Sequence, residues 1–138
     1  MATTSYDQQA LAQGKTFVWH EVYGPKSQDL IDFYTKALDW GSQEMDMGGG
    51  FTYKMLVANG QPVCGVMGTS EMEGMGDVPP HWSTYIAVDN VDERQAKCEA
   101  LGATKLHGPM DVPTIGRMVL MQDPGGATFW LYQAAMGE

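Results

Sequence analysis

The chain has 138 residues, a size typical of one compact domain with a substantial hydrophobic core. Hydrophobic residues make up 43% and charged residues 18% of the sequence, which indicates a globular protein and excludes general disorder. The formal net charge of −9 would repel phosphate backbones and anionic lipid surfaces, so neither nucleic acids nor membranes are expected as partners.

The N-terminal segment and the cysteines bear on the expected location. Residues 1–14 are polar and lack the basic start and apolar stretch of a secretion signal, so we expect a flexible arm. No apolar run approaches the roughly 20 residues of a membrane span. Cys64 and Cys98 match no disulfide framework, which favours reduced thiols in a cytoplasmic protein.

The first part of the chain predicts a strand, a helix and three further strands. Residues 15–23 alternate and are rich in aromatic and β-branched side chains, a pattern typical of a strand. Ser27 is a candidate N-cap for a helix whose apolar residues recur at helical spacing to Leu38. Three strands follow at about 42–47, 51–58 and 62–68, and Asn59-Gly60 is a hairpin signal between the last two.

The same order of elements then returns. Residues 69–80 have the composition of a linker, and residues 81–89 predict a strand. Asn90 and Glu93 resemble a capping box at the start of a helix that Gly102 ends. Three strands fit at about 104–109, 116–122 and 126–132.

The two parts therefore form an internal repeat. Gly60 and Gly126 are 66 positions apart, and so are Cys64 and Trp130. The sequence predicts a single α+β domain over residues 15–138, with βαβββ modules at 15–68 and 81–133 joined by the linker. Each module leaves one sheet face without a helix, so the pair is expected to enclose a concave cup, which is the natural pocket.

The repeat resembles the vicinal oxygen chelate superfamily, which contains glyoxalases, bleomycin-resistance proteins and extradiol dioxygenases. The resemblance covers about residues 16–133 and is carried by "LIDFYTKALDWG", "YIAVDNVDE" and "VLMQDPGGATFWLY". It implies a glyoxalase-like fold and a homodimer. In the metal-dependent members, His, Glu or Gln from the first and last strands of each half hold one divalent ion. Those four slots fall here at Trp19, Cys64, Ser83 and Trp130.

These four residues make a poor divalent metal site. Such a site needs about three nitrogen or oxygen donors, whereas indole rings offer no lone pair and only Cys64 is a strong donor. A slip of one residue on the first strand would place His20 in the first slot, and one His with one Cys would still be insufficient. We therefore expect no cofactor, with one divalent metal ion as the alternative.

The alternation of the strands predicts which side chains line the cup. The expected lining is aromatic with a few hydroxyls and one carboxylate, which suits a small, partly aromatic or hydrophobic molecule. Glu21 is the candidate catalytic base, because a desolvated carboxylate gains affinity for protons. The predicted ligand-binding residues are Trp19, Glu21, Tyr23, Cys64, Ser83, Tyr85, Thr128, Trp130 and Tyr132.

Structural roles compete with each of these assignments. Trp19 and Trp130 would fill the cup if no cavity exists, and Glu21 would serve as one half of an ion pair with Arg117. Cys64 would alternatively be a small buried residue of the core that takes no part in chemistry.

The histidines carry weaker signals. His20 shares the parity of the valines that face the helix, which favours a core histidine. His81 stands at a strand entrance, where it either borders the pocket mouth or is simply exposed, and His107 carries no signal.

Three functions are compatible with this pattern. The preferred one is metal-independent binding of a small molecule, as in bleomycin-resistance proteins. The second is a glyoxalase-like lyase or isomerase that uses a metal or Glu21 as base. The third is a degenerate member with a filled cup that acts through protein association. The fold leaves these open because one fold hosts many chemistries.

Overall fold

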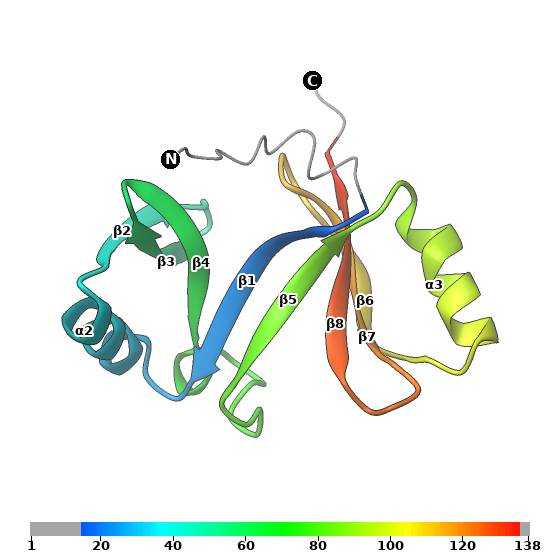
Figure 1. Ribbon diagram of the computed structural model, residues 1–138, viewed down its shortest axis with the longest axis horizontal. Helices are drawn as coiled ribbons and strands as arrows, with labels where there is room; N and C mark the ends of the chain where they lie inside the picture. The colour runs from blue at the N-terminus through cyan, green and yellow to red at the C-terminus, as the bar shows by residue number, and fades with distance from the viewer. Residues whose placement is uncertain (1–14, 136–138) are drawn as a thin grey trace. The chain divides into compact units, whose positions relative to one another are not determined.

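The computed structural model describes residues 15–135, in which two βαβββ modules follow one another as predicted (Figure 1). The α+β fold class is therefore confirmed. The first module has β1 (Phe17–Gly24), α2 (Ser27–Leu38), β2 (Gly41–Asp46), β3 (Thr52–Ala58) and β4 (Gln61–Gly68). A short 3-10 turn η1 (Thr69–Glu71) precedes the second module, which has β5 (His81–Ala87), α3 (Val91–Ala100), β6 (Thr104–Val112), β7 (Gly116–Gln122) and β8 (Thr128–Ala134).

The described residues divide into two compact units. Residues Trp19–Ser83 form one, which we call the first unit, and residues 15–18 with 84–135 form the second unit. The predicted arm at residues 1–14 lies outside the part of the chain that the structure describes. Within the described range, neither helix is long and apolar enough to cross a membrane.

In the first unit, α2 covers one face of a four-stranded sheet. The strand order is β2-β3-β4-β1, with β1 and β4 parallel and the other pairs antiparallel. The apolar residues of α2 recur at helical spacing, and this stripe packs on the sheet. The core under the helix consists of Val22, Ile31, Leu56, Cys64 and Val66.

The second unit repeats this arrangement around α3. The strand order is β5-β8-β7-β6, with β5 and β8 parallel. The core between α3 and the sheet consists of Val88, Val91, Val119, Met121 and Leu131. In both units the opposite sheet face is built from the alternate residues of the same strands.

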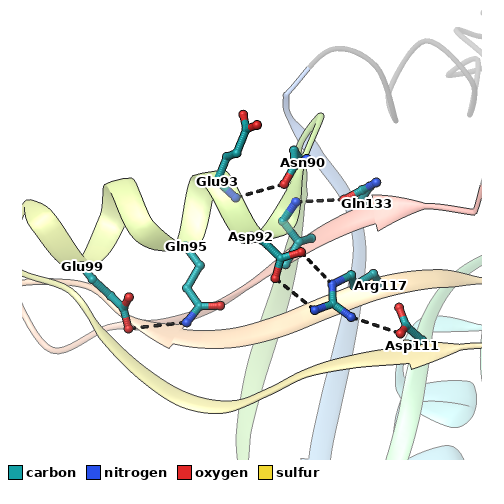
Figure 2. Close-up of polar contacts among 9 residues, drawn as sticks. Asn90, Asp92, Glu93, Gln95, Glu99, Asp111, Arg117 and Gln133 are labelled. Carbon is teal, nitrogen blue, oxygen red and sulfur yellow. Dashed lines mark hydrogen bonds and ion pairs between the residues drawn. The ribbon is translucent and has the colours of Figure 1, made fainter.

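The N-terminus of α3 is capped as the sequence predicts (Figure 2). The Asn90 side chain accepts a hydrogen bond from the Glu93 backbone N–H at 3.0 Å, and Gln133 accepts one from the Val91 N–H at 2.9 Å. On the same side, the Arg117 guanidinium bridges Asp92 and Asp111 at 3.0 Å each. These ion pairs are exposed, so solvent screens them and they add little to the stability of the fold.

The N-terminus of α2 is capped differently, and the predicted role of Ser27 is corrected. Ser27 is the first residue of the helix, and the cap comes from Glu71 of η1, inside the predicted linker. The Glu71 carboxylate accepts hydrogen bonds from the Ser27 backbone N–H at 2.9 Å and from the Ser27 hydroxyl at 2.8 Å. Gly68 allows this approach, because a Cβ at that position would collide with the Glu71 carboxylate.

Candidate functional site

A buried carboxylate on the sheet face opposite α2 is the centre of the candidate site. Glu21 lies on β1 between Trp19 and Tyr23, and its side chain alternates with the core residue Val22. Only 5% of Glu21 is exposed. A buried carboxylate needs hydrogen-bond donors to remain charged, so its neighbours decide what it can do.

Two tyrosines and one tryptophan supply those donors. The Tyr23 hydroxyl donates to Oε1 of Glu21 at 2.7 Å, and the Tyr53 hydroxyl donates to Oε2 at 2.7 Å. The Trp19 indole N–H in turn donates to the Tyr53 hydroxyl oxygen at 2.8 Å. We call these four residues the phenol–carboxylate cluster. Because its bonds to Glu21 are charge-assisted, they are stronger than bonds between neutral groups.

Gly65 creates the space in which Tyr53 reaches Glu21. Gly65 pairs with Glu21 across the parallel β1–β4 ladder and with Met55 across β3–β4. A Cβ on Gly65 would collide with the Tyr53 hydroxyl and would lie 3.1 Å from Cγ of Glu21. The absence of a side chain at this position is therefore a condition for the cluster.

The electrostatics of the cluster keep Tyr53 protonated. Burial raises the pKa of the Tyr53 phenol far above its ordinary value, and the negative charge of Glu21 and the hydrogen bond to it raise that pKa further. Tyr53 therefore acts as a hydrogen-bond donor over the whole physiological pH range.

His81 borders the cluster at the start of β5. Its ring stacks on Tyr23 with centroids 4.7 Å apart and planes 4° from parallel. Nδ1 lies 2.7 Å from the Pro79 carbonyl oxygen, and because a carbonyl only accepts, Nδ1 carries the hydrogen. In the neutral ring Nε2 is then an acceptor, so His81 can receive a hydrogen bond from a bound molecule.

The second unit carries an aromatic stack on the face opposite α3. Tyr85 and Trp130 lie on neighbouring strands, with ring centroids 5.2 Å apart and planes 3° from parallel. The Trp130 indole N–H is buried and has no hydrogen-bond partner among residues 15–135. A buried donor without a partner is unfavourable by about 1–3 kcal/mol, so an acceptor on a ligand would be bound well there.

The remaining predicted site residues are placed as follows. The Tyr132 hydroxyl donates to the Ile115 carbonyl oxygen at 2.6 Å, and Thr128 is exposed at the start of β8. Ser83, in the first unit, is 4% exposed, and its hydroxyl makes no hydrogen bond within the described range.

Cys64 does not lie where the sequence predicts. It packs in the core under α2, on the opposite face of β4 from the phenol–carboxylate cluster. The reason is a β-bulge: Leu56 pairs with Cys64 but the next residue, Val57, pairs with Pro62. One extra residue in β4 reverses the direction of every later side chain, so Gly65 takes the expected place of Cys64.

Burial also determines the state of the Cys64 thiol. Burial raises its pKa from 9.0 to about 11. The thiol is therefore protonated at neutral pH, and this is the inert state of a structural cysteine.

Comparison with known proteins identifies the family. The family model described as "Glyoxalase-like domain" matches residues 22–132, which is most of the chain. The chain belongs to the glyoxalase-like domain family. The predicted resemblance to the vicinal oxygen chelate superfamily is thereby confirmed.

Relatives of this glyoxalase-like chain are longer proteins. "Putative glyoxylase CFP32" of Mycobacterium tuberculosis is 32% identical over 120 residues, covering 87% of this chain and 44% of the relative. "Anthracycline biosynthesis protein DnrV" of Streptomyces peucetius is 26% identical over 133 residues, covering 87% of this chain and 47% of that protein. The chain thus spans about half the length of the curated relatives that it matches.

A solved structure supports the glyoxalase-like fold. Methylmalonyl-CoA epimerase of Streptomyces coelicolor, in complex with 2-nitronate-propionyl-CoA, has a TM-score of 0.58 and 15% identity. The match covers 87% of this chain and 98% of the epimerase chain. At this identity the likeness shows the fold alone.

The metal positions of the superfamily do not fit a divalent ion in this glyoxalase-like chain. The first unit offers Trp19, whose N–H is bonded to Tyr53, then Gly65 in the place expected of Cys64, and the hydroxyl of Ser83. The second unit offers the Trp130 indole. None of these is an imidazole or a carboxylate, and within residues 15–135 no three His, Cys, Asp or Glu side chains come together.

Two structural alternatives from the sequence are wrong. His20 is exposed rather than a core histidine. Arg117 pairs with Asp92 and Asp111 in the second unit, not with Glu21.

Tyr53 and Gly65 are site residues that the sequence did not reveal. The sheet face to which Tyr53 points, opposite to that of the core residue Leu56, is known only from the register of β3. The role of Gly65 is visible only from the side chains that surround it. A usable signal for Tyr53 is that it lies two residues before Met55 on β3, so the two side chains point to the same sheet face.

Proposed function

We propose that this chain binds a small, flat, partly aromatic molecule without a metal, at the phenol–carboxylate cluster of the first unit. The observation that carries the proposal is the Glu21 carboxylate, buried and held at both oxygens by phenols. Carboxylate oxygens accept hydrogen bonds, so a hydroxyl of a ligand can bind Glu21 by replacing one of the phenols. A rigid, desolvated acceptor among aromatic rings is typical of small-molecule sites.

The surrounding groups indicate what the ligand presents. Glu21 and Nε2 of His81 are acceptors, which favours a ligand with hydroxyl donors. The aromatic rings of Trp19 and Tyr23 favour a flat ligand with π faces. In the second unit, the Tyr85–Trp130 stack supports the same ligand class, because the Trp130 indole N–H has no partner within residues 15–135. The name of one relative refers to anthracycline biosynthesis, and fused hydroxylated rings fit this description.

Sequestration, as in bleomycin-resistance proteins, is the role that we propose for this binding. Both oxygens of Glu21 already accept phenolic hydrogens, so the carboxylate must exchange a partner before it takes a proton from a substrate. This arrangement favours binding of a ligand rather than its chemical conversion. We further propose that the protein acts as a cytoplasmic homodimer, which sedimentation equilibrium of the purified chain tests.

A glyoxalase-like lyase or isomerase with Glu21 as base is the second candidate. The family membership and the relative named as a glyoxylase favour it. Solvent deuterium exchange at the α-carbon of methylmalonyl-CoA, followed by NMR, would detect such a base. Exchange that disappears in Glu21→Gln would establish this candidate in place of sequestration.

Binding of 1,4-dihydroxyanthraquinone, a flat hydroxylated probe, tests the preferred function. We expect saturable quenching of tryptophan fluorescence, because the Trp19 indole belongs to the cluster. Glu21→Gln and Tyr53→Phe should each weaken binding about tenfold, which corresponds to about 1.4 kcal/mol. Tyr34→Phe is the matched control, since Tyr34 packs with Trp40 and Trp82 away from the cluster. Absent binding, or binding that neither cluster variant weakens, contradicts the proposal.

A further inference from the structure

A cavity lies in the first unit, at the end of the sheet nearest the start of α2. It has a volume of about 380 Å³, within the range of about 300–1,000 Å³ in which small-molecule sites fall. Tyr53 and Lys54 are neighbours on β3, so their side chains point to opposite faces of the sheet. Tyr53 joins the phenol–carboxylate cluster and Lys54 lines this cavity. The residues around it are Ser27, Phe51, Thr52, Lys54, Val66, Met67, Gly68, Glu71, Met72 and Glu73.

The charged residues of the cavity are not equally available. Glu71 is committed to the N-terminus of α2, where it accepts two hydrogen bonds from Ser27. Lys54 donates one hydrogen bond, to the Ser27 hydroxyl at 2.9 Å, and attracts the Glu71 carboxylate without forming a close ion pair with any described residue. An ammonium has three N–H groups, so Lys54 retains two donors for a ligand.

Glu73 supplies the opposite charge. It lines the same cavity, is exposed, and makes no hydrogen bond or ion pair within the part of the chain that the structure describes. The cavity therefore holds one available cation and one available carboxylate. A ligand with a single charge would satisfy one of them and be repelled by the other, whereas a ligand with both charges would pair with both.

The apolar part of the wall completes the description of the ligand. Phe51 is 42% exposed, and Met67 and Met72 line the same cavity. Methionine side chains adapt to apolar groups of different shape, and the Phe51 ring offers a flat surface. Lys54 and Glu73 select for charges, and these three residues select for an apolar side chain.

We propose that this cavity binds a zwitterionic ligand of the α-amino-acid class with an apolar side chain. Its carboxylate pairs with the Lys54 ammonium, its ammonium pairs with the Glu73 carboxylate, and its side chain packs on Phe51 and the two methionines. The site is separate from the phenol–carboxylate cluster, so binding at this cavity can be tested independently of the function proposed above.

Calorimetric titration with L-phenylalanine, L-leucine and L-methionine tests the inference. We expect saturable binding of at least one of them to the whole chain. Phenethylamine and 3-phenylpropanoate each lack one charge and should bind at least about tenfold more weakly than L-phenylalanine. Failure of all three amino acids to bind, or equal binding of the singly charged analogues, overturns the inference.

Variants then locate the site. Glu73→Gln should weaken L-phenylalanine about tenfold and should strengthen 3-phenylpropanoate, whose carboxylate Glu73 repels, while Lys54→Gln should weaken both. Asp39→Asn and Lys36→Gln are matched controls on exposed positions of the same unit and should change neither. Because Lys54 also contacts Ser27, Phe51→Ala provides a second test and should weaken L-phenylalanine comparably. Binding that Glu73→Gln and Phe51→Ala leave unchanged places the ligand elsewhere and contradicts the inference.

Discussion

The two units of this protein share one order of elements and differ in the sheet face that no helix covers. In the first unit that face holds a carboxylate with phenol and indole donors, all of them paired. In the second unit the corresponding face holds stacked rings and an indole N–H without a partner in the described range. The helix-covered faces are alike, each an aliphatic core.

This difference shows that the two modules share the residue types of the helix-covered sheet face and differ in those of the opposite face. The helix-covered face must exclude water to hold the module together, so both units retain apolar residues there. The opposite face is not required for that packing, and each unit places different groups on it. The stability of the first unit should therefore be sensitive to changes in hydrogen bonding and side-chain volume at the cluster. The stability of the second unit should be sensitive to loss of buried ring area in the aromatic stack.

The largest expected effect comes from the aromatic stack. Trp130→Ala removes a buried ring and should lower the free energy of unfolding by about 3–5 kcal/mol. Trp130→Phe keeps a ring against Tyr85 and loses only an unpaired N–H, so it should cost less than about 1.5 kcal/mol. Urea unfolding of both variants measures this. Equal losses would mean that the indole N–H, rather than ring area, stabilises the second unit.

The polar cluster is tested through the residue that makes room for it. Gly65→Ala forces a methyl group against the Tyr53 hydroxyl and should destabilise the protein by about 1–3 kcal/mol. Gly76→Ala is the matched control, because a Cβ there meets no atom within 4 Å. Urea midpoints should separate the two variants clearly. A Gly65→Ala protein as stable as Gly76→Ala would show that Tyr53 does not approach Glu21 as described.

The helix caps give a smaller, pH-dependent contrast between the units. Asn90→Ala and Glu71→Ala should each cost about 1 kcal/mol at pH 7. Hydrogen bonds from the Ser27 backbone and hydroxyl hold the pKa of Glu71 below its ordinary 4.5, so the Glu71 contribution is present above that pH and is lost as the pH falls through the lowered value.

Thermal unfolding over a pH series separates the two caps. The difference between Glu71→Ala and the parent protein should vanish in acid, and that of Asn90→Ala should persist. A Glu71→Ala difference that is independent of pH would contradict capping by a charged carboxylate.

An effect that is absent at neutral pH is a titration in the core of the first unit. The pKa of Cys64 is raised by burial from 9.0 to about 11, so the folded state holds this proton more tightly than the unfolded state. The corresponding stability is complete below pH 9 and is lost as the pH rises from about 9 to about 11. Cys64→Ala should reduce this alkaline slope, measured by urea unfolding, and Cys98→Ala should not. Equal slopes in Cys64→Ala and the parent protein would contradict the burial of the thiol.

Much of the fold was predictable because its signals are local. The repeat of strand, helix and three strands follows from alternation, helical spacing and turn residues, and the Asn90 cap follows from residue types three positions apart. The cap of α2 was not predictable in this way, because its carboxylate comes from Glu71, 44 residues beyond Ser27.

The residues of the candidate site were predictable only on strands whose side chains alternate regularly between the two sheet faces. Trp19, Glu21 and Tyr23 share one face because β1 alternates regularly. Cys64 was assigned to that face from the constant offset of 66 residues between the two modules, which does not allow for an extra residue in β4. That bulge is visible only in the pairing of β3 with β4. Tyr53 and Gly65 escaped for the same reason, since their meeting depends on register rather than on spacing within one strand.

Metal-independent binding at the phenol–carboxylate cluster is the central claim, and one titration tests it directly. The affinity for 1,4-dihydroxyanthraquinone should be measured before and after exhaustive dialysis against a chelator, with the metal content of each sample determined by plasma mass spectrometry. The dissociation constant should be the same in both samples. Binding that disappears on chelation and returns with about one equivalent of a divalent metal, the stoichiometry of a single site, would contradict it.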